Sequence, residues 1–173
     1  MGTRHLIIVR ADEKLRVAQY GQWDGYPSVQ GKRVLDFLKM LNKNAANLNQ
    51  FNERLRKLYF MTAKQLKDYW AAAGADKQGF ISIDASEKAK ADHPELSRDT
   101  GAKILKVIYD STAKKMGLDN AISFLTEFDC EWAYEIDLDK KKFMVYRDGR
   151  KTPLRGYSLD KLPTQTQLNK LDN

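Results

Sequence analysis

The stretch "RHLIIVRADEKLRVAQYGQW", residues 4–23, contains two short β-rich runs on either side of the polar residues "ADEK". β-branched and other apolar residues fill both runs, and a tight polar turn between two such runs is typical of a β-hairpin. If the turn is centred in "ADEK", Arg10 pairs with Leu15, and the register of the remaining pairs follows. The sequence therefore predicts an N-terminal hairpin.

This register places polar residues at the open end of the hairpin. Side chains alternate across a strand, so four polar residues are expected on one face: Thr3, His5, Tyr20 and Gln22. Arg4, Gln19 and Gly21 are expected on the opposite face. The next helix begins just beyond Asp24, and free N–H groups at a helix start suit an anion. The same residues are also explained as a helix cap, an Asp-Gly turn and a core histidine.

Helical spacing of apolar residues follows in the segments 26–41 and 47–61. A third helix is expected over 62–74, with Thr62 as N-cap, Gln65 completing a capping box and Gly74 at the end. "FISID", residues 80–84, indicates a short strand. A further helix is expected within 96–111, entered through Ser97 or Asp99.

A second hairpin is predicted from "FDCEWAYEIDLD", residues 128–139, and "FMVYRDG", residues 143–149, and a short helix is expected in the tail. We therefore expect one α+β domain over residues 1–173, with two hairpins forming an antiparallel sheet covered by helices.

Two sets of residues in the second hairpin suggest chemistry. Cys130 could act as a nucleophile with His5 and Asp24, although its place on the apolar face of its strand is typical of inert packing. Three acidic residues share the other face and could bind Mg²⁺ or transfer protons, an exposed acidic face being the preferred interpretation: Glu131, Glu135 and Asp137. No metal-binding or phosphate-loop motif is present, so no cofactor or metal is predicted.

The net charge of +7 is unevenly distributed. The first 60 residues and the last 33 are basic, and the middle of the chain is acidic. Such a pattern fits a basic rim around an anion site, and it makes nucleic acid a possible but less favoured partner. The single cysteine and the lack of a signal-peptide pattern or a long apolar run predict a cytoplasmic protein with no membrane segment.

Four stretches together resemble a family of uncharacterised proteins found in fungi, bacteria and phages: "MGTRHLI", "AQYGQWDGYP", "LSRDTGAKIL" and "CEWAYEIDLD". The resemblance runs from Met1 to about Pro163 and implies no known activity. It supports a site made of polar positions in these stretches, and a phage-borne member could sequester or degrade a host signalling molecule.

A motif at the very N-terminus is also similar to that of the N-terminal-nucleophile hydrolases, which implies a sandwich fold as an alternative. This chain departs from their pattern, because removal of Met1 would leave Gly2 rather than a nucleophile at the terminus.

Our leading hypothesis is a protein that binds a small anionic ligand, for example a nucleotide-like one, at the end of the first hairpin. Nine residues would contact it: Thr3, Arg4, Gln19, Tyr20, Gln22, Trp23, Tyr26, Arg98 and Asp99. The alternatives are a hydrolase or transferase that uses His5 and Asp24 with Cys130, and a module that binds nucleic acid or protein.

Overall fold

The N-terminal hairpin forms as predicted in the computed structural model, which describes residues 2–172. Strand β1 (His5–Ala11) pairs antiparallel with β2 (Lys14–Gly21). Asp12 and Glu13 both have positive φ angles, 54° and 59°. Two consecutive left-handed residues make the type I′ turn whose twist matches that of a two-stranded hairpin.

The two hairpins join through a parallel pair, so the expectation of a purely antiparallel sheet was wrong. Strand β1 pairs parallel with β5 (Trp132–Asp137), and β5 pairs antiparallel with β6 (Lys142–Arg147). A strand that was not predicted, β7 (Arg155–Ser158), completes the order β2-β1-β5-β6-β7. A parallel pair requires a long crossover, and the chain between the hairpins is long enough to supply it.

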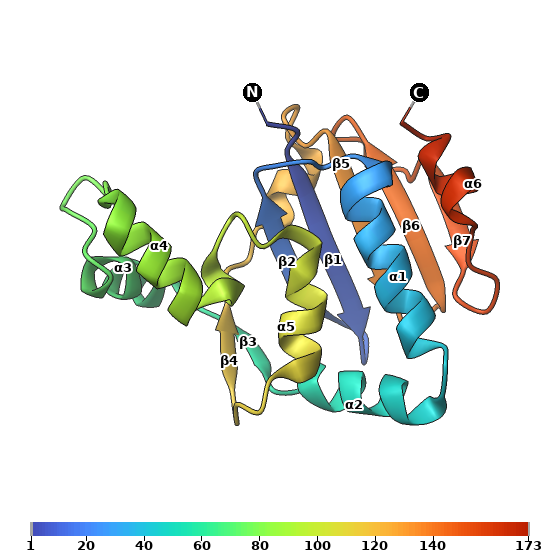
Figure 1. The fold of residues 1–173 in the computed structure, drawn as a ribbon, viewed down its shortest axis with the longest axis horizontal. Helices are drawn as coiled ribbons and strands as arrows, with labels where there is room; N and C mark the ends of the chain where they lie inside the picture. The colour runs from blue at the N-terminus through green and yellow to red at the C-terminus, as the bar shows by residue number, and fades with distance from the viewer. Residues whose placement is uncertain (1, 173) are drawn as a thin grey trace.

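Helices cover one face of this sheet (Figure 1). A single π-helical turn, η1 (Pro27–Gly31), leads into α1 (Lys32–Leu41), and α2 (Ala45–Leu55), α5 (Ile104–Asp110) and α6 (Gln165–Asn169) pack beside it. The helix spacing predicted within 26–41 is confirmed, because α1 buries Val34, Leu35, Phe37, Leu38 and Leu41 against the sheet.

The opposite face of the sheet is covered only in part, by the 3₁₀ helix η4 (Ile122–Thr126) and the loop after it. Within residues 2–172 the remaining strands, β3 (Leu58–Phe60) and β4 (Met116–Leu118), form a separate parallel pair. The described residues thus make one large mixed sheet in an α+β domain, rather than the two stacked sheets of the sandwich alternative.

The helices α3 (Ala63–Ala72) and α4 (Ile83–Asp92) project beyond the β2 side of the sheet (Figure 1). We call residues 62–93 the arm. The capping box of Thr62 and Gln65 is present as predicted, and Gly74 follows the helix with a φ of 101°. The strand expected over 80–84 is wrong, because Ser82 caps α4 through the N–H of Ala85 and Ile83 is already helical.

Two other predicted boundaries were also misplaced. The helix expected over 47–61 ends at Leu55, because residues 58–60 pair with β4 as a strand. The helix expected to start at Ser97 or Asp99 begins only after a 3₁₀ turn, η3 (Gly101–Lys103), and a second such turn, η2 (Pro94–Leu96), lies before it.

The acidic residues of β5 do not form the exposed face that we preferred from the sequence. Glu135 and Asp137 are buried, with 5% and 3% of their surface exposed. Glu135 accepts hydrogen bonds from Arg10 and from the Tyr146 hydroxyl, and Asp137 accepts from the N–H of Lys140. Both carboxylates are therefore bonded to other groups of the two hairpins.

In the described part of the chain no helix is both long and apolar enough to cross a lipid bilayer.

The turns of the two hairpins are tied together by Asp139. Its carboxylate accepts the N–H of Asp12 at 3.0 Å and that of Glu13 at 2.9 Å. We expect Asp139→Ala to lower the free energy of unfolding by about 1–2 kcal/mol, because two charge-assisted bonds are lost at an exposed site. Urea unfolding measures this change, with Asp160→Ala as the control. Equal stability of the two variants would contradict this role.

Candidate functional site

A β-bulge moves the register of the first hairpin. Arg10 pairs with Leu15 as predicted, but Val9 pairs with Val17, so Arg16 has no partner on β1. The Arg16 guanidinium instead donates to the Ala11 carbonyl and to Asp12 at the turn. From the bulge onward every pair is displaced by one residue, and a displacement of one moves side chains to the other face.

The predicted polar face is therefore divided between the two sides of the sheet. His5 pairs with Gly21, and Gln19 pairs with Ile7 on the helix-covered side. Tyr20 pairs with Leu6 and packs edge-on against Phe124 of η4 on the other side, with ring centroids 4.9 Å apart. The expected grouping of Thr3, His5, Tyr20 and Gln22 on one face was wrong.

His5 lies buried between two glycines. A Cβ on Gly21 would overlap the imidazole, and a Cβ on Gly101 would lie 2.9 Å from Nε2. Gly101 also has a φ of 51°, which favours glycine. Only 1% of His5 is exposed, and within residues 2–172 neither ring nitrogen has a hydrogen-bond partner. The imidazole is held by close packing.

This environment keeps His5 neutral. Burial lowers the pKa of His5 to about 4, and the positive charge of Arg33 lowers it further. The backbone of Thr3 has an opposite effect, smaller than that of burial, and raises the pKa, although it does not meet hydrogen-bond geometry.

The polar residues around His5 join the loop after β2 to the loop before η3. Gln19 donates to the Ser97 carbonyl at 3.0 Å, and the N–H of Gln22 donates to the Arg98 carbonyl at 3.0 Å. The Trp23 indole donates to Asp99 at 3.1 Å. These side chains and backbone groups hold the two loops against each other.

Gln30 is a member of this network that the sequence did not indicate. Its amide donates to the Trp23 carbonyl and accepts the N–H of Ala102, and only 3% of the residue is exposed. In the sequence Gln30 is recognisable only as a polar residue just before the amphipathic segment that forms α1.

The turn after β2 is anchored to the start of the chain. The buried Thr3 accepts the N–H of Gly25 at 2.9 Å, and the hydroxyl of Tyr134 donates to the Gly25 carbonyl. Trp23 and Tyr26 remain about half exposed.

Arg4 belongs to a second cluster, on the η4 side. Its guanidinium forms two contacts with Asp129, at 2.8 and 2.9 Å, and its N–H donates to Glu131. The Tyr20 hydroxyl donates to Gln22 at 2.6 Å. Burial raises the pKa of Tyr20, while the nearby charges of Arg4 and Arg98 oppose the shift. The charge that we expected Arg4 to offer a ligand is already compensated by Asp129.

The structure does not assemble Cys130, His5 and Asp24 into a catalytic arrangement. Cys130 packs with Leu6 and Ile8 on the η4 side, whereas His5 lies on the helix side. Burial, with a smaller effect of the Glu131 charge, raises the pKa of the Cys130 thiol to about 12. Asp24 is exposed, and among the hydrogen bonds of residues 2–172 none joins it to His5. In the same residues no three acidic, histidine or cysteine side chains cluster as a metal site.

A large hollow lies between the arm and the loop before η3. This groove has a volume of about 1010 Å³, and residues from Leu66 to Ile81, from α4 and from the 96–98 and 119 positions line it. Trp70, Leu66 and Leu96 supply apolar walls, and Phe80 is 75% exposed at its rim. Of the nine residues predicted to contact a ligand, Arg98 lines this groove.

The groove carries positive charge that the protein does not neutralise. Within the described residues, Lys67, Lys77 and Arg98 have no carboxylate within 4.0 Å. Lys90 differs, because it is bound by Glu87 at 2.8 Å and Asp99 at 2.7 Å. Two acidic residues also line the groove, Asp76 and Asp119. Asp76 accepts the N–H groups of Gln78 and Phe80 and so fixes the turn at the rim.

Comparisons with protein-family models, with curated proteins and with solved structures find no match for this chain. The assignment of a site therefore depends on the geometry of the chain itself. The polar network around His5 is buried, and its groups are bonded within the protein. The groove beside it is open and contains cations without carboxylate partners among the described residues.

The contact between His5 and Gly21 can be tested by substitution. We expect Gly21→Ala to lower the free energy of unfolding by about 1–3 kcal/mol or more, because the added methyl overlaps the imidazole. His5→Ala/Gly21→Ala should lose less stability than the sum of the single variants in urea unfolding. The control is Gly156→Ala, whose Cβ would lie 3.9 Å from Met144. Additive effects would contradict the direct contact.

The depressed pKa of His5 predicts a pH dependence of stability. The unfolded chain binds a proton near pH 6.5 and the folded chain only near pH 4, so stability falls as pH drops from 6.5 to 4. The His5 contribution over this window is on the order of 3 kcal/mol. Urea unfolding of His5→Gln should show a smaller slope across this window than the wild type. An unchanged slope would show that other groups cause the acid sensitivity.

Proposed function

We propose that this protein binds a small anionic ligand with an aromatic part, such as a nucleotide, in the groove between the arm and the loop before η3. The observation that carries the proposal is the combination of three cations without carboxylate partners, Lys67, Lys77 and Arg98, with Trp70 and Phe80 in one groove. Small-molecule sites combine apolar walls with a few polar groups that fix orientation.

Arg98 lies on a loop whose backbone is bonded to the first hairpin. Its carbonyl accepts the N–H of Gln22, and the neighbouring Ser97 carbonyl accepts the amide of Gln19. The loop that bears its guanidinium is thus bonded to the end of the N-terminal hairpin. A guanidinium presented from such a loop can grip a phosphate or carboxylate through two N–H groups.

The aromatic residues of the arm would bind the other end of the ligand. Trp70 forms an edge-on contact with Tyr69, and Tyr69 in turn packs edge-on against His93. These contacts restrict the position of the Trp70 ring. Phe80 follows the turn held by Asp76 and lies largely exposed at the rim. Base stacking on such rings contributes about 1–3 kcal/mol per base.

The location differs from the one expected from the sequence. The polar side chains at this end of the sheet already have partners within the protein. Gln19 bonds the Ser97 carbonyl, Gln22 the Tyr20 hydroxyl, and Asp99 the Trp23 indole. We infer that they position the Arg98 loop, and that the ligand contacts lie on its groove side.

Native mass spectrometry of gently purified protein tests the proposal first. We expect a co-purified nucleotide or similar anion, which denaturation would release for identification. A fluorescent methylanthraniloyl derivative of ATP then serves as a probe for titration.

Arg98→Ala and Trp70→Ala should each weaken probe binding roughly tenfold or more, because one removes a charge-assisted contact and the other a stacking surface. Lys64→Ala is the matched control, since Lys64 is 84% exposed on α3 and pairs with Asp68. Circular dichroism confirms that each variant is folded. Equal weakening by the control, or no weakening by either groove variant, would overturn the proposal.

A further inference from the structure

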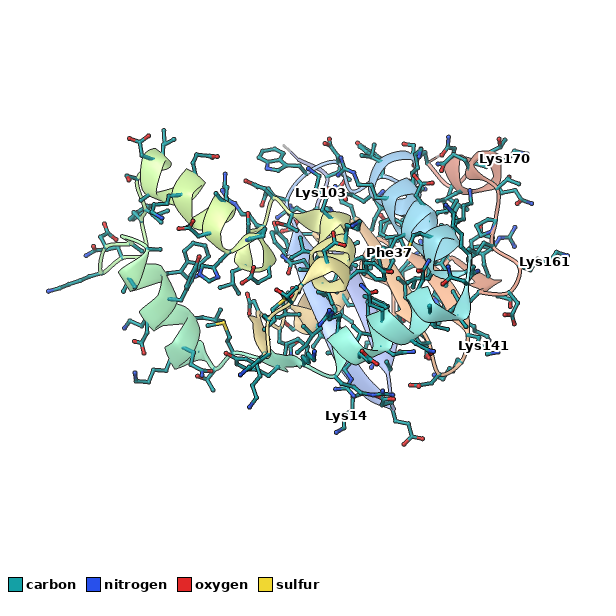
Figure 2. The ribbon with its side chains drawn as sticks, turned by 60° about the horizontal axis from the view of Figure 1, so that its bottom comes forward. Lys14, Phe37, Lys103, Lys141, Lys161 and Lys170 are labelled. Atoms are coloured by element: carbon teal, nitrogen blue, oxygen red, sulfur yellow. The ribbon has the colours of Figure 1, made fainter. Side chains whose placement is uncertain are left out.

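A second positive surface lies at the other edge of the sheet, far along the chain from the groove. It consists of basic residues of β6, of the loop after it, of β7 and of the C-terminal segment: Arg147, Arg150, Lys151, Arg155, Lys161 and Lys170. We call these six residues the basic edge. Figure 2 shows Lys161 and Lys170 on the side formed by the C-terminal strands and α6, away from Lys14 and Lys103.

The charges of the basic edge are not neutralised by the protein. Arg147 has one carboxylate nearby, that of Asp148 at 3.7 Å, and the other five have none within 4.0 Å among residues 2–172. Four lysines on the helices differ, because each pairs with an aspartate one turn later: Lys32, Lys64, Lys88 and Lys106. Paired charges make a solvated helix face, whereas unpaired like charges attract an anion.

Two hollows lie along this edge. One, of about 600 Å³, is lined by Arg155, Tyr157, Gln167 and Lys170. The other, of about 400 Å³, is lined by Arg147, Arg150 and Leu154 among others. Leu154 and Arg155 are adjacent in the chain, so the hollows follow one another along β7.

The two arginines of neighbouring strands project from the same side of the sheet. Arg155 pairs with Val145, and Arg147 is two residues beyond Val145 on β6, so all three share the side that α6 covers. The Arg147 guanidinium lies over the Trp132 ring, 5.0 Å from its centroid. Tyr157 stacks against Phe143 and also lines the larger of the two hollows.

We propose that the basic edge binds single-stranded nucleic acid. Proteins that bind single strands combine a cationic track for the phosphates with aromatic rings on which bases stack. The basic edge supplies five unpaired cations, and the Tyr157 ring of β7 and the amide of Gln167 of α6 line the larger hollow beside Arg155 and Lys170. A membrane surface fits less well, because Leu154 is the large apolar residue exposed here, at 45%, and α6 spans only five residues.

Basic residues on an edge strand also discourage pairing with other chains. This role requires charge at β7 but no affinity for phosphates, and it predicts aggregation of neutral variants without any effect on nucleic-acid binding. Binding measurements and light scattering on the same variants therefore separate the two explanations.

The test is fluorescence anisotropy with a labelled 20-nucleotide oligothymidine and the full chain. Arg155→Ala/Lys170→Ala should weaken binding at least tenfold and reduce the slope of log K against log salt by roughly 1.4, because two phosphate contacts are lost. Tyr157→Leu should weaken binding severalfold with no change of slope. The matched control is Lys14→Ala/Lys103→Ala, which removes the same charge elsewhere.

Several outcomes would overturn the proposal. Equal weakening by the control pair would mean that only net charge matters. No measurable binding of oligothymidine by the wild type, or binding of vesicles that contain phosphatidylserine in its place, would exclude a single-strand site. Melting temperatures of the variants establish that they are folded, and Arg155→Lys/Lys170→Arg should retain the salt slope of the wild type.

Discussion

The parallel pairing of β1 with β5 determines where most other elements of the fold lie. β1 is bonded on both sides, and its residues from Leu6 to Val9 are fully buried. A parallel partner forces the chain to return to the end of the sheet where β1 begins. The loops around residues 22–26, 97–102 and 127–131 consequently gather at that end, and the return path carries every helix except α6 (Figure 1).

At that end, one close packing arrangement determines what the polar residues can do. The imidazole of His5 occupies the space that Gly21 and Gly101 leave, and Gln19 and Gln30 satisfy backbone groups of the facing loop. A histidine with polar neighbours is typical of an active site, but His5 is buried, so a substrate could not reach its imidazole. The same network holds the Arg98 loop at the wall of the groove, so under the proposed function the histidine acts indirectly.

Both proposed binding surfaces depend on cations that the protein's own carboxylates do not compensate. The net charge of +7 alone does not locate a partner. Four helical lysines, Lys32, Lys64, Lys88 and Lys106, are compensated one turn later, and Arg4 is compensated by Asp129. The groove and the basic edge retain uncompensated cations beside aromatic rings. The groove lies next to β2 and the basic edge at β7, the two edge strands of the sheet. A small ligand in the groove and a nucleic acid on the basic edge would therefore not compete for space.

Features that depend on neighbours along the chain could be predicted from the amino-acid sequence: the two hairpins, the apolar face of α1 and the capping box at Thr62. These follow from periodicity, turn geometry and caps, which act over a few residues. The sequence also indicated the polar stretches that meet at one end of the sheet. Tertiary structure alone decided how they meet. The bulge at Arg16 reversed the faces, the parallel pairing buried Glu135 and Asp137, and the docking of the arm created the groove. Each depends on contacts between segments far apart in the chain, which local patterns do not encode.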